Sequence, residues 1–260
     1  KSQVLILESD KELIQEQENK KTPQSIFIVG MPRSGSTLLE SIISMNQDVF
    51  DLGEDNMFEK TFLQYKMLLK QNQQTNFSEL YLKNISLRSK KIKIYTNKLL
   101  YNYQYVGLIL KLIPNAKVIH SFRNPLDNIL SIYRAHFAQG NRYSSSLLDS
   151  AKVYLDHANI MNEYKNIFDS RIYNLNYDLL VTDPINQIRT LINWLGWDWN
   201  DCYLSPHLSS RSVSTASSVQ VRSPINNKSI GGWKNYKGML KPALHIINSN
   251  TEYKKLLFEE

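Results

Sequence analysis

Apolar residues follow two different spacings along the chain, and the change between them predicts a repeated order of strands and helices. Short apolar runs rich in β-formers predict buried strands at 26–29, 92–95, 116–121 and 172–175. Apolar residues at helical spacing predict helices at 38–43, within 61–90, and at 101–112, 125–137, 147–164 and 184–195. Strands that alternate with helices favour an α/β fold, with a mainly parallel sheet covered by helices on both faces.

The regular pattern weakens toward the ends of the chain. Residues 203–232 are rich in Ser and Asn, and we expect a long loop that covers the functional site. Residues 1–23 are charged and rich in Gln, and we interpret them as an N-terminal arm or the end of an upstream region. The remaining residues, 24–260, are predicted to form one domain, which is long enough for a well-filled core.

The first predicted strand runs into a loop bounded by Gly30 and Gly35, and a helix follows. This geometry presents backbone N–H groups to an anion, and the helix N-terminus adds partial positive charge. The glycine spacing matches the nucleotide-binding loop G-x-x-x-x-G-K-[ST], but Ser36 occupies the lysine position. Arg33 is the cation within the loop. We therefore expect a phosphate or sulfate to be bound by Arg33, Ser34, Gly35, Ser36 and Thr37.

The missing lysine limits the kind of ligand. Hydrolysis of ATP or GTP requires that lysine on the β- and γ-phosphates and an acidic residue that holds magnesium. The strand predicted at 116–121 does not end in Asp or Glu. We therefore expect a ligand without a γ-phosphate and a site without a metal. A P-loop nucleotide kinase is the alternative within the fold, and a non-catalytic nucleotide-binding or scaffold domain is the alternative from another class.

A second stretch combines a cation with a hydroxyl. Arg123 leaves a predicted strand, and Ser131 lies eight residues later, two turns along the next predicted helix. Both side chains could hold one phosphate, with a charge-assisted bond from the guanidinium and a hydrogen bond from the hydroxyl. In parallel sheets the ligand lies beyond the carboxyl ends of the strands. Residues that follow strand ends, among them Lys98 and Tyr177, are therefore expected to converge on one site.

Composition narrows the choice of partners. The chain has 31 Lys plus Arg against 24 Asp plus Glu, which gives a net charge of +7. This balance favours anionic ligands, but the excess is too diffuse to argue for nucleic acid. Cys202 is the single cysteine, which excludes an intrachain disulfide. Because we find neither a membrane-spanning run nor a signal-peptide pattern, we expect no membrane partner and a cytoplasmic location.

Both phosphate motifs resemble those of the sulfotransferases. The loop at 33–37 resembles their 5′-phosphosulfate loop, and residues 123–131 resemble their 3′-phosphate motif. Tyr177, followed by Asp183-Pro184, resembles the tyrosine segment of the same family. The resemblance implies a P-loop nucleotide-binding architecture and the cofactor 3′-phosphoadenosine 5′-phosphosulfate. It also implies 3′,5′-adenosine bisphosphate as the product and no need for a metal.

Two later stretches extend the resemblance. Residues 214–225 are similar to a late loop of protein-tyrosine sulfotransferases, and closer still to bacterial sulfotransferases with upstream tetratricopeptide repeats. Residues 228–236 are similar to the cofactor-closing segment of cytosolic sulfotransferases. The resemblance therefore adds Ser217, Arg222 and Lys228 to the expected cofactor contacts. The positive cluster of the cytosolic members is not reproduced residue for residue around Lys228.

The resemblance also implies a catalytic base. Cytosolic members carry a catalytic His after the second strand, whereas residues 96–100 of this chain contain none. Protein-tyrosine sulfotransferases use a Glu in a Gly-Glu-Glu segment, which Gly53-Glu54-Asp55 matches. Glu54 is therefore the expected base, and Lys98 and Arg33 are the expected transition-state cations. We interpret His120 and His136 as structural residues.

The acceptor cannot be identified from the residues. A peptide tyrosine, a sugar hydroxyl and a small phenol or alcohol all stay open, as does a homodimer. We interpret Trp194, Trp197 and Trp199 as packing residues, with an acceptor platform as the alternative. The reaction implied by the resemblance is transfer of a sulfuryl group to a hydroxyl by in-line displacement.

Overall fold

The computed structural model describes residues 22–88, 93–135, 137, 140–209 and 222–249. Five strands among them form one sheet with the order β2-β3-β1-β4-β5, and every neighbouring pair is parallel. The strands are β1 (Gln24–Gly30), β2 (Val49–Asp51), β3 (Ile94–Asn97), β4 (Ala116–Phe122) and β5 (Ile172–Asn176). The predicted α/β fold with a parallel sheet is thus confirmed.

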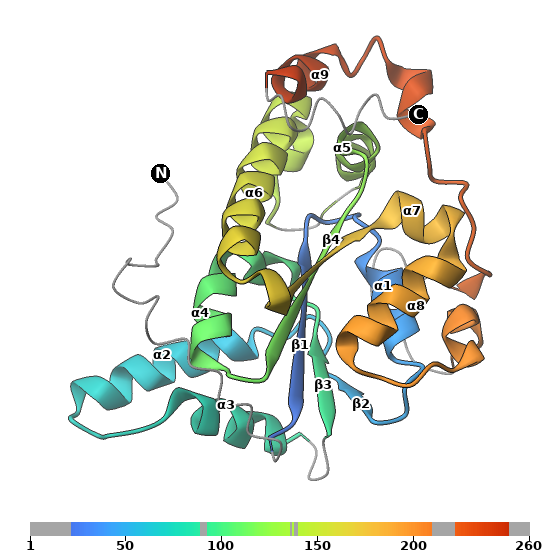
Figure 1. Cartoon of the computed structure of the whole chain (residues 1–260). Helices are drawn as coiled ribbons and strands as arrows, with labels where there is room; N and C mark the ends of the chain where they lie inside the picture. Colours follow the sequence, from blue (N-terminus) through green and yellow to red (C-terminus); the bar gives the residue numbers. More distant parts are fainter. Residues whose placement is uncertain (1–21, 89–92, 136, 138–139, 210–221, 250–260) are drawn as a thin grey trace.

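Helices lie on both faces of the sheet (Figure 1). They are α1 (Ser36–Ile43), α2 (Met57–Lys70), α3 (Phe77–Ser86), α4 (Val106–Leu112), α5 (Pro125–Arg134), α6 (Leu147–Ile167), α7 (Tyr177–Thr182), α8 (Pro184–Leu195) and α9 (Lys241–Asn248). Helices α4 and α6 lie on one side of the sheet in this view, and α1, α7 and α8 lie on the other.

The central strand β1 shows why helices cover both faces. Successive side chains of a strand point to opposite faces, and all apolar residues of β1 are fully buried. Phe27 and Val29 pack with aromatic residues of α2 and α3, while Ile26 and Ile28 pack with α1 and α8. The predicted packing role of Trp194, Trp197 and Trp199 agrees with their place at the edge of the α1–α8 cluster.

A third apolar cluster lies beyond the carboxyl ends of the strands. It joins Met31 of the first loop to α5, α6 and α9 and includes Trp233. The cluster fixes α5 above β1 and β4 (Figure 1). The loop after β1 and the N-terminus of α5 are thereby held at the carboxyl ends of the strands, where a parallel sheet binds its ligands.

Several predicted elements differ from the observed ones. The helix expected at 101–112 is a 3₁₀ turn, Leu100–Tyr105, followed by the short α4. The cause is Asn102, whose amide donates to Asn97 Oδ1 at 2.7 Å and fixes this turn against β3. The helix expected at 125–137 ends at Arg134, since Ala135 is extended. Strand β2 and helices α7 and α9 were not predicted.

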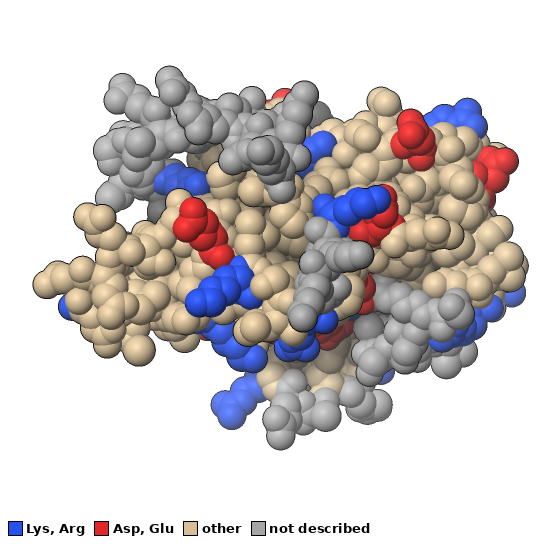
Figure 2. All heavy atoms as spheres, turned by 90° about the horizontal axis from the view of Figure 1, so that it is seen from below, with Lys and Arg blue, Asp and Glu red and all other residues tan. Residues whose placement is uncertain are grey.

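The distribution of charged side chains on the surface agrees with the diffuse positive excess that the composition indicates. On the face shown in Figure 2, Lys and Arg side chains form several separate groups with acidic residues among them. None of the helices in the described ranges is long and apolar enough to cross a membrane.

His120 on β4 and His157 on α6 form a buried pair with ring centroids 4.9 Å apart. His120 Nδ1 lies 3.1 Å from Asn174 Oδ1. Burial lowers the pKa of His120 from 6.5 to about 4, while the contact with Asn174 opposes this shift. Burial and the neighbouring His120 lower the pKa of His157 well below its usual value. Both imidazole rings are therefore neutral side chains of the interior. This agrees with the interpretation of His120 as a structural residue. His136 lies outside the described residues.

Acid should destabilise the fold through this pair. Below pH 6.5 the unfolded chain binds protons that the buried rings do not, so stability is complete above about 6.5 and falls toward pH 4. At pH 5 the loss is about 2 kcal/mol for His120. Urea unfolding of His120→Gln at pH 7 and pH 5 should show a smaller pH dependence than the unsubstituted protein. The exposed His245→Gln is the control, and equal pH dependence in all three proteins would contradict the role of the pair.

Candidate active site

The loop between β1 and α1 depends on two glycines with positive φ, Gly30 and Gly35. A Cβ at Gly30 would overlap the backbone oxygen of Ser121 on the neighbouring strand. Gly35 has φ 91° and lies under the ring of Tyr177, which a Cβ would overlap. The loop is thus pressed between β4 and α7, and its close turn opens directly into the N-terminus of α1.

Arg33 lies at the tip of this loop and joins it to α5. Its backbone is left-handed, with φ 68°, and its Nε donates to Ser131 Oγ at 3.1 Å. The side-chain amide of Asn128 donates to Pro32 O at 2.9 Å and ties the same loop to α5. Burial and the nearby Arg123 guanidinium lower the pKa of Arg33, while Tyr177 opposes this shift. An anion placed here would therefore meet two converging guanidinium groups.

Arg123 is a buried cation between two carboxylates. It follows β4 and is 6% exposed, with Nη2 3.8 Å from Asp127 Oδ2 and Nε 3.9 Å from Asp178 Oδ1. Its Nη2 also donates to Ser229 O at 2.5 Å, and its guanidinium lies over the Tyr177 ring at 4.9 Å. Burial raises the pKa of Asp178, against the opposing influence of the Asn124 amide and Arg123. Arg123 therefore links β4, α5, α7 and the late segment of the chain.

Asp127 fixes that late segment against α5. Its carboxylate accepts hydrogen bonds from the backbone N–H of Gly231 at 2.7 Å and of Trp233 at 2.9 Å. The side chain is 3% exposed, so both bonds lie away from water. Residues 222–233 are thereby held along one side of the loop after β1, although they lie far from it in the sequence.

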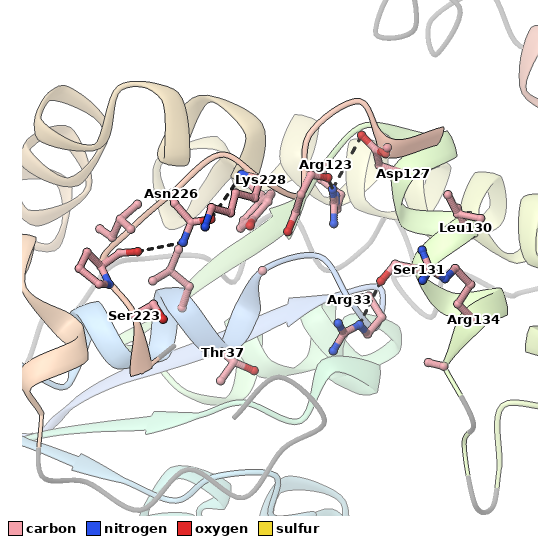
Figure 3. Close-up of a pocket in the computed structure, with 18 of the residues that line it drawn as sticks. Arg33, Thr37, Arg123, Asp127, Leu130, Ser131, Arg134, Ser223, Asn226 and Lys228 are labelled. Atoms are coloured by element: carbon pink, nitrogen blue, oxygen red, sulfur yellow. Dashed lines mark hydrogen bonds and ion pairs between the residues drawn. The ribbon is translucent and has the colours of Figure 1, made fainter. Parts of the chain in front are cut away.

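These elements enclose a cavity of about 850 Å³ (Figure 3). Arg33, Ser131 and Arg134 lie on one side of it, and Asn226 and Lys228 lie on the other. The remaining wall residues are Gly35, Thr37, Leu38, Arg123, Asp127, Leu130, Ala135, Phe137, Tyr177, Ser223, Pro224, Ile225, Ser229 and Gly232. Four cationic side chains thus face one cavity, which suits a ligand with more than one anionic group.

A second charged group lies beside α1. Lys98 follows β3, and its Nζ lies 2.6 Å from Glu54 Oε1 and 3.7 Å from Glu40 Oε2. The Lys98 side chain is 2% exposed, whereas the Glu54 side chain is 54% exposed. A proton acceptor open to water and a buried cation therefore lie side by side, which is an arrangement that can serve proton transfer.

The structure brings together many of the predicted site residues. Around the cavity lie Arg33, Gly35, Thr37, Arg123, Ser131, Tyr177 and Lys228. Ser34 and Ser36 belong to the same loop but are buried outside the cavity wall, and Glu54 and Lys98 pair with each other. Arg222 is exposed, donates to Ser209 O at 3.0 Å and is not part of the wall. Ser217 lies outside the described residues, as does much of the loop expected at 203–232.

Sequence reasoning missed the carboxylates that hold the predicted cations. Asp127 lies in the first turn of α5, only four residues after Arg123, and this closeness in the sequence was a usable signal. Glu40 lies four residues after Ser36 on α1, which places it on the loop side of the helix. Asp178 reaches Arg123 from α7, a helix that the sequence did not predict.

No group of three His, Cys, Asp or Glu side chains in the described ranges is arranged to hold a metal ion.

Comparison with known proteins agrees with the fold. A family model described as the sulfotransferase family matches residues 23–201. A protein from Aquifex aeolicus (strain VF5) is 33% identical over 89% of this chain and 33% of its own length. A protein-tyrosine sulfotransferase from Drosophila melanogaster is 24% identical over 83% of this chain and 48% of its own length. The chain thus spans about a third to a half of these relatives.

A solved structure shows the same fold. The mouse sulfotransferase complexed with PAP has a TM-score of 0.57 and 17% identity, over 91% of this chain and 89% of the mouse chain. The family model matches more than half of the residues of this chain. The chain therefore belongs to the sulfotransferase family. The predicted family is confirmed.

The contact of Gly35 with Tyr177 can be tested by adding one methyl group. In Gly35→Ala, the left-handed backbone costs about 1–2 kcal/mol, and overlap with the ring adds about 1–3 kcal/mol. Gly53→Ala is a matched control, since Gly53 also has positive φ, at 64°, but has nothing within 4 Å of an added Cβ. Urea unfolding should show the larger loss for Gly35→Ala, and equal losses would exclude a tight contact.

Proposed function

We propose that this chain transfers a sulfuryl group from 3′-phosphoadenosine 5′-phosphosulfate to a hydroxyl acceptor. The observation that carries the proposal is the hydrogen bond of 3.1 Å between Arg33 Nε and Ser131 Oγ. It joins the loop expected to bind the 5′ end of the cofactor to the helix expected to bind the 3′-phosphate. One ligand with phosphate groups at both ends can therefore contact both motifs in the cavity. The mouse neighbour complexed with PAP, which is 3′,5′-adenosine bisphosphate, supports the same cofactor.

The cofactor contacts follow from the cavity wall. We assign the phosphosulfate to Arg33 and to the backbone N–H groups of 34–37 at the start of α1. We assign the 3′-phosphate to Ser131 and Arg123, with Lys228 closing the opposite side. Tyr177 would hold the nucleoside beside the loop, and Arg222 and Ser217 are the further cofactor contacts that the resemblance implies.

The chemistry assigns separate roles to Glu54 and Lys98. Glu54 removes the proton of the acceptor hydroxyl as a general base. The acceptor oxygen attacks sulfur, and the bond between sulfur and the phosphate oxygen breaks. The electron pair of that bond remains on the phosphate, where Lys98, Arg33 and the loop amides stabilise the negative charge. The ion pair between Glu54 and Lys98 must loosen for Glu54 to reach the acceptor.

Two alternatives differ from this proposal, one in the ligand that is bound and the other in the absence of transfer. A nucleotide kinase would bind ATP with magnesium, but Ser36 stands where its loop lysine would be. A non-catalytic nucleotide-binding or scaffold domain would bind the cofactor without transfer and would not need Glu54 beside Lys98. For the acceptor, the name of the Drosophila relative makes a tyrosine peptide the first to test, followed by sugars and small phenols or alcohols. A homodimer stays open.

Ligand binding separates these functions directly. 3′,5′-Adenosine bisphosphate should raise the melting temperature without magnesium, because a ligand that binds only the folded state stabilises it by mass action. Incubation with ³⁵S-labelled cofactor and an acceptor panel should then transfer label. Stabilisation by ATP with magnesium, but not by the bisphosphate, would contradict the proposal. Bisphosphate binding without transfer to any acceptor would favour the non-catalytic alternative.

Ser131→Ala tests the 3′-phosphate assignment better than Arg123→Ala, which would also leave Asp127 and Asp178 without their shared cation. Loss of a hydrogen bond to a phosphate should weaken bisphosphate binding about 10- to 100-fold. Binding of adenosine 5′-phosphate should change little. Titration calorimetry measures both, and the exposed Ser145→Ala is the control. Equal losses for the two ligands would remove Ser131 from this site.

Glu54→Gln should abolish sulfuryl transfer while bisphosphate affinity stays nearly unchanged. The amide keeps the size of the side chain but does not accept the proton, so the rate should fall about 10²- to 10⁴-fold. Asp55→Asn is the adjacent control, since the Asp55 carboxylate pairs with Arg88 at 2.7 Å. It should retain most activity. Normal turnover by Glu54→Gln in the labelled-cofactor assay would show that another group is the base.

A further inference from the structure

Lys98 has two carboxylate neighbours that differ sharply in their access to water. Glu54 Oε1 is the nearer, at 2.6 Å, but its side chain is 54% exposed. Glu40 Oε2 lies at 3.7 Å, and its side chain is 7% exposed. Lys98 itself is among the largest fully buried side chains of the structure. One carboxylate is thus part of the interior with Lys98, while the other faces solvent and an incoming acceptor.

This difference matters because a buried charge is costly unless a counter-charge stays beside it. In the proposed reaction Glu54 takes a proton and becomes neutral. The interaction between Glu54 and Lys98 would then weaken at the stage when Lys98 must hold its charge against the departing phosphate. Glu40 takes up no proton in this step, so its negative charge persists beside Lys98.

Glu40 is also fixed relative to the phosphate-binding loop. It lies on α1, the helix that begins at Ser36 directly after that loop. Its backbone oxygen accepts hydrogen bonds from both the Ser44 amide and the Ser44 hydroxyl at the helix end. Helix α1 therefore carries the anion-binding N–H groups at its start and the carboxylate facing Lys98 one turn later.

We infer that Glu40 is a positioning residue that keeps Lys98 charged and aimed at the departing phosphate while Glu54 is protonated. The inference rests on the proposed function. In the transfer step the bond between the acceptor oxygen and sulfur forms, and the bond between sulfur and the phosphate oxygen breaks. The hydroxyl proton passes to Glu54, and the electron pair of the broken bond stays on the phosphate. Neither Glu40 nor Lys98 gains or loses a proton.

The primary test is Glu40→Gln, which keeps the shape of the side chain and removes its charge. We expect kcat to fall about 10- to 100-fold, the usual effect of losing a group that orients a reacting one. Bisphosphate affinity should stay within about threefold. Glu40→Asp should recover part of the rate, and the exposed Glu79→Gln on α3 is the matched control.

An unchanged kcat in Glu40→Gln would overturn the inference. A parallel loss of kcat and bisphosphate affinity would also overturn it, since Glu40 would then shape the loop rather than act through Lys98.

A stability cycle provides a second arm that needs no activity. Glu40→Gln and Lys98→Met should each lower the melting temperature by several degrees. The melting temperature of the double variant should fall by less than the sum of these two decreases. Lys98→Met removes the cation beside the buried Glu40 carboxylate, whereas replacing both residues leaves no such charge behind. Additive losses would overturn the pairing of Glu40 with Lys98. Absence of label transfer to every acceptor would instead contradict the proposed function, while the cycle would still decide the pairing.

Discussion

The buried ion group around Arg123 is the constraint on which the shape of the cavity depends. A guanidinium that is 6% exposed must have counter-charges nearby, and Asp127 and Asp178 supply them from two different helices. Asp127 binds the backbone of the 231–233 segment through the same carboxylate. A single cation thus fixes the relative positions of β4, α5, α7 and a distant part of the chain. The walls of the cavity follow from that arrangement.

Much of the fold could be predicted from the sequence because its signals are local. The apolar run of β1, the glycines of the loop and the helical spacing of α6 each act within a few turns of the chain. The elements that were missed depend on distant partners. The 3₁₀ turn at Leu100–Tyr105 is fixed by the bond of Asn102 to Asn97, and α7 begins where Asn176 caps its first amides. The spacing of apolar residues along the chain gives no information about either of these asparagine hydrogen bonds.

The residues of the candidate site likewise fall into two groups, those that short motifs predict and those that depend on contacts between distant parts of the chain. Arg33, Arg123 and Ser131 could be chosen from short motifs, since each motif places a cation or hydroxyl next to a strand end. The carboxylates of Asp178 and Glu40 could not, because they contact Arg123 and Lys98 only through the tertiary packing of the chain. The hydrogen bond between Arg33 and Ser131 also joins two motifs that the sequence assigned to opposite ends of the ligand. Local patterns therefore identify the groups that bind anions, and packing decides how those groups are balanced.

The bond from Arg33 to Ser131 also couples the two anion-binding motifs. Because each side chain is the other's hydrogen-bond partner, an anion that attracts Arg33 releases the Ser131 hydroxyl, and an anion at Ser131 releases Arg33. A ligand fragment with one phosphate must break this bond alone, whereas a ligand with two phosphates replaces both halves of it. The proposed cofactor, which carries phosphate groups at its 3′ and 5′ positions, would thereby be favoured over nucleoside monophosphates by more than the sum of the individual contacts. The bond between Arg33 and Ser131 thus acts as an internal competitor against ligands with a single phosphate.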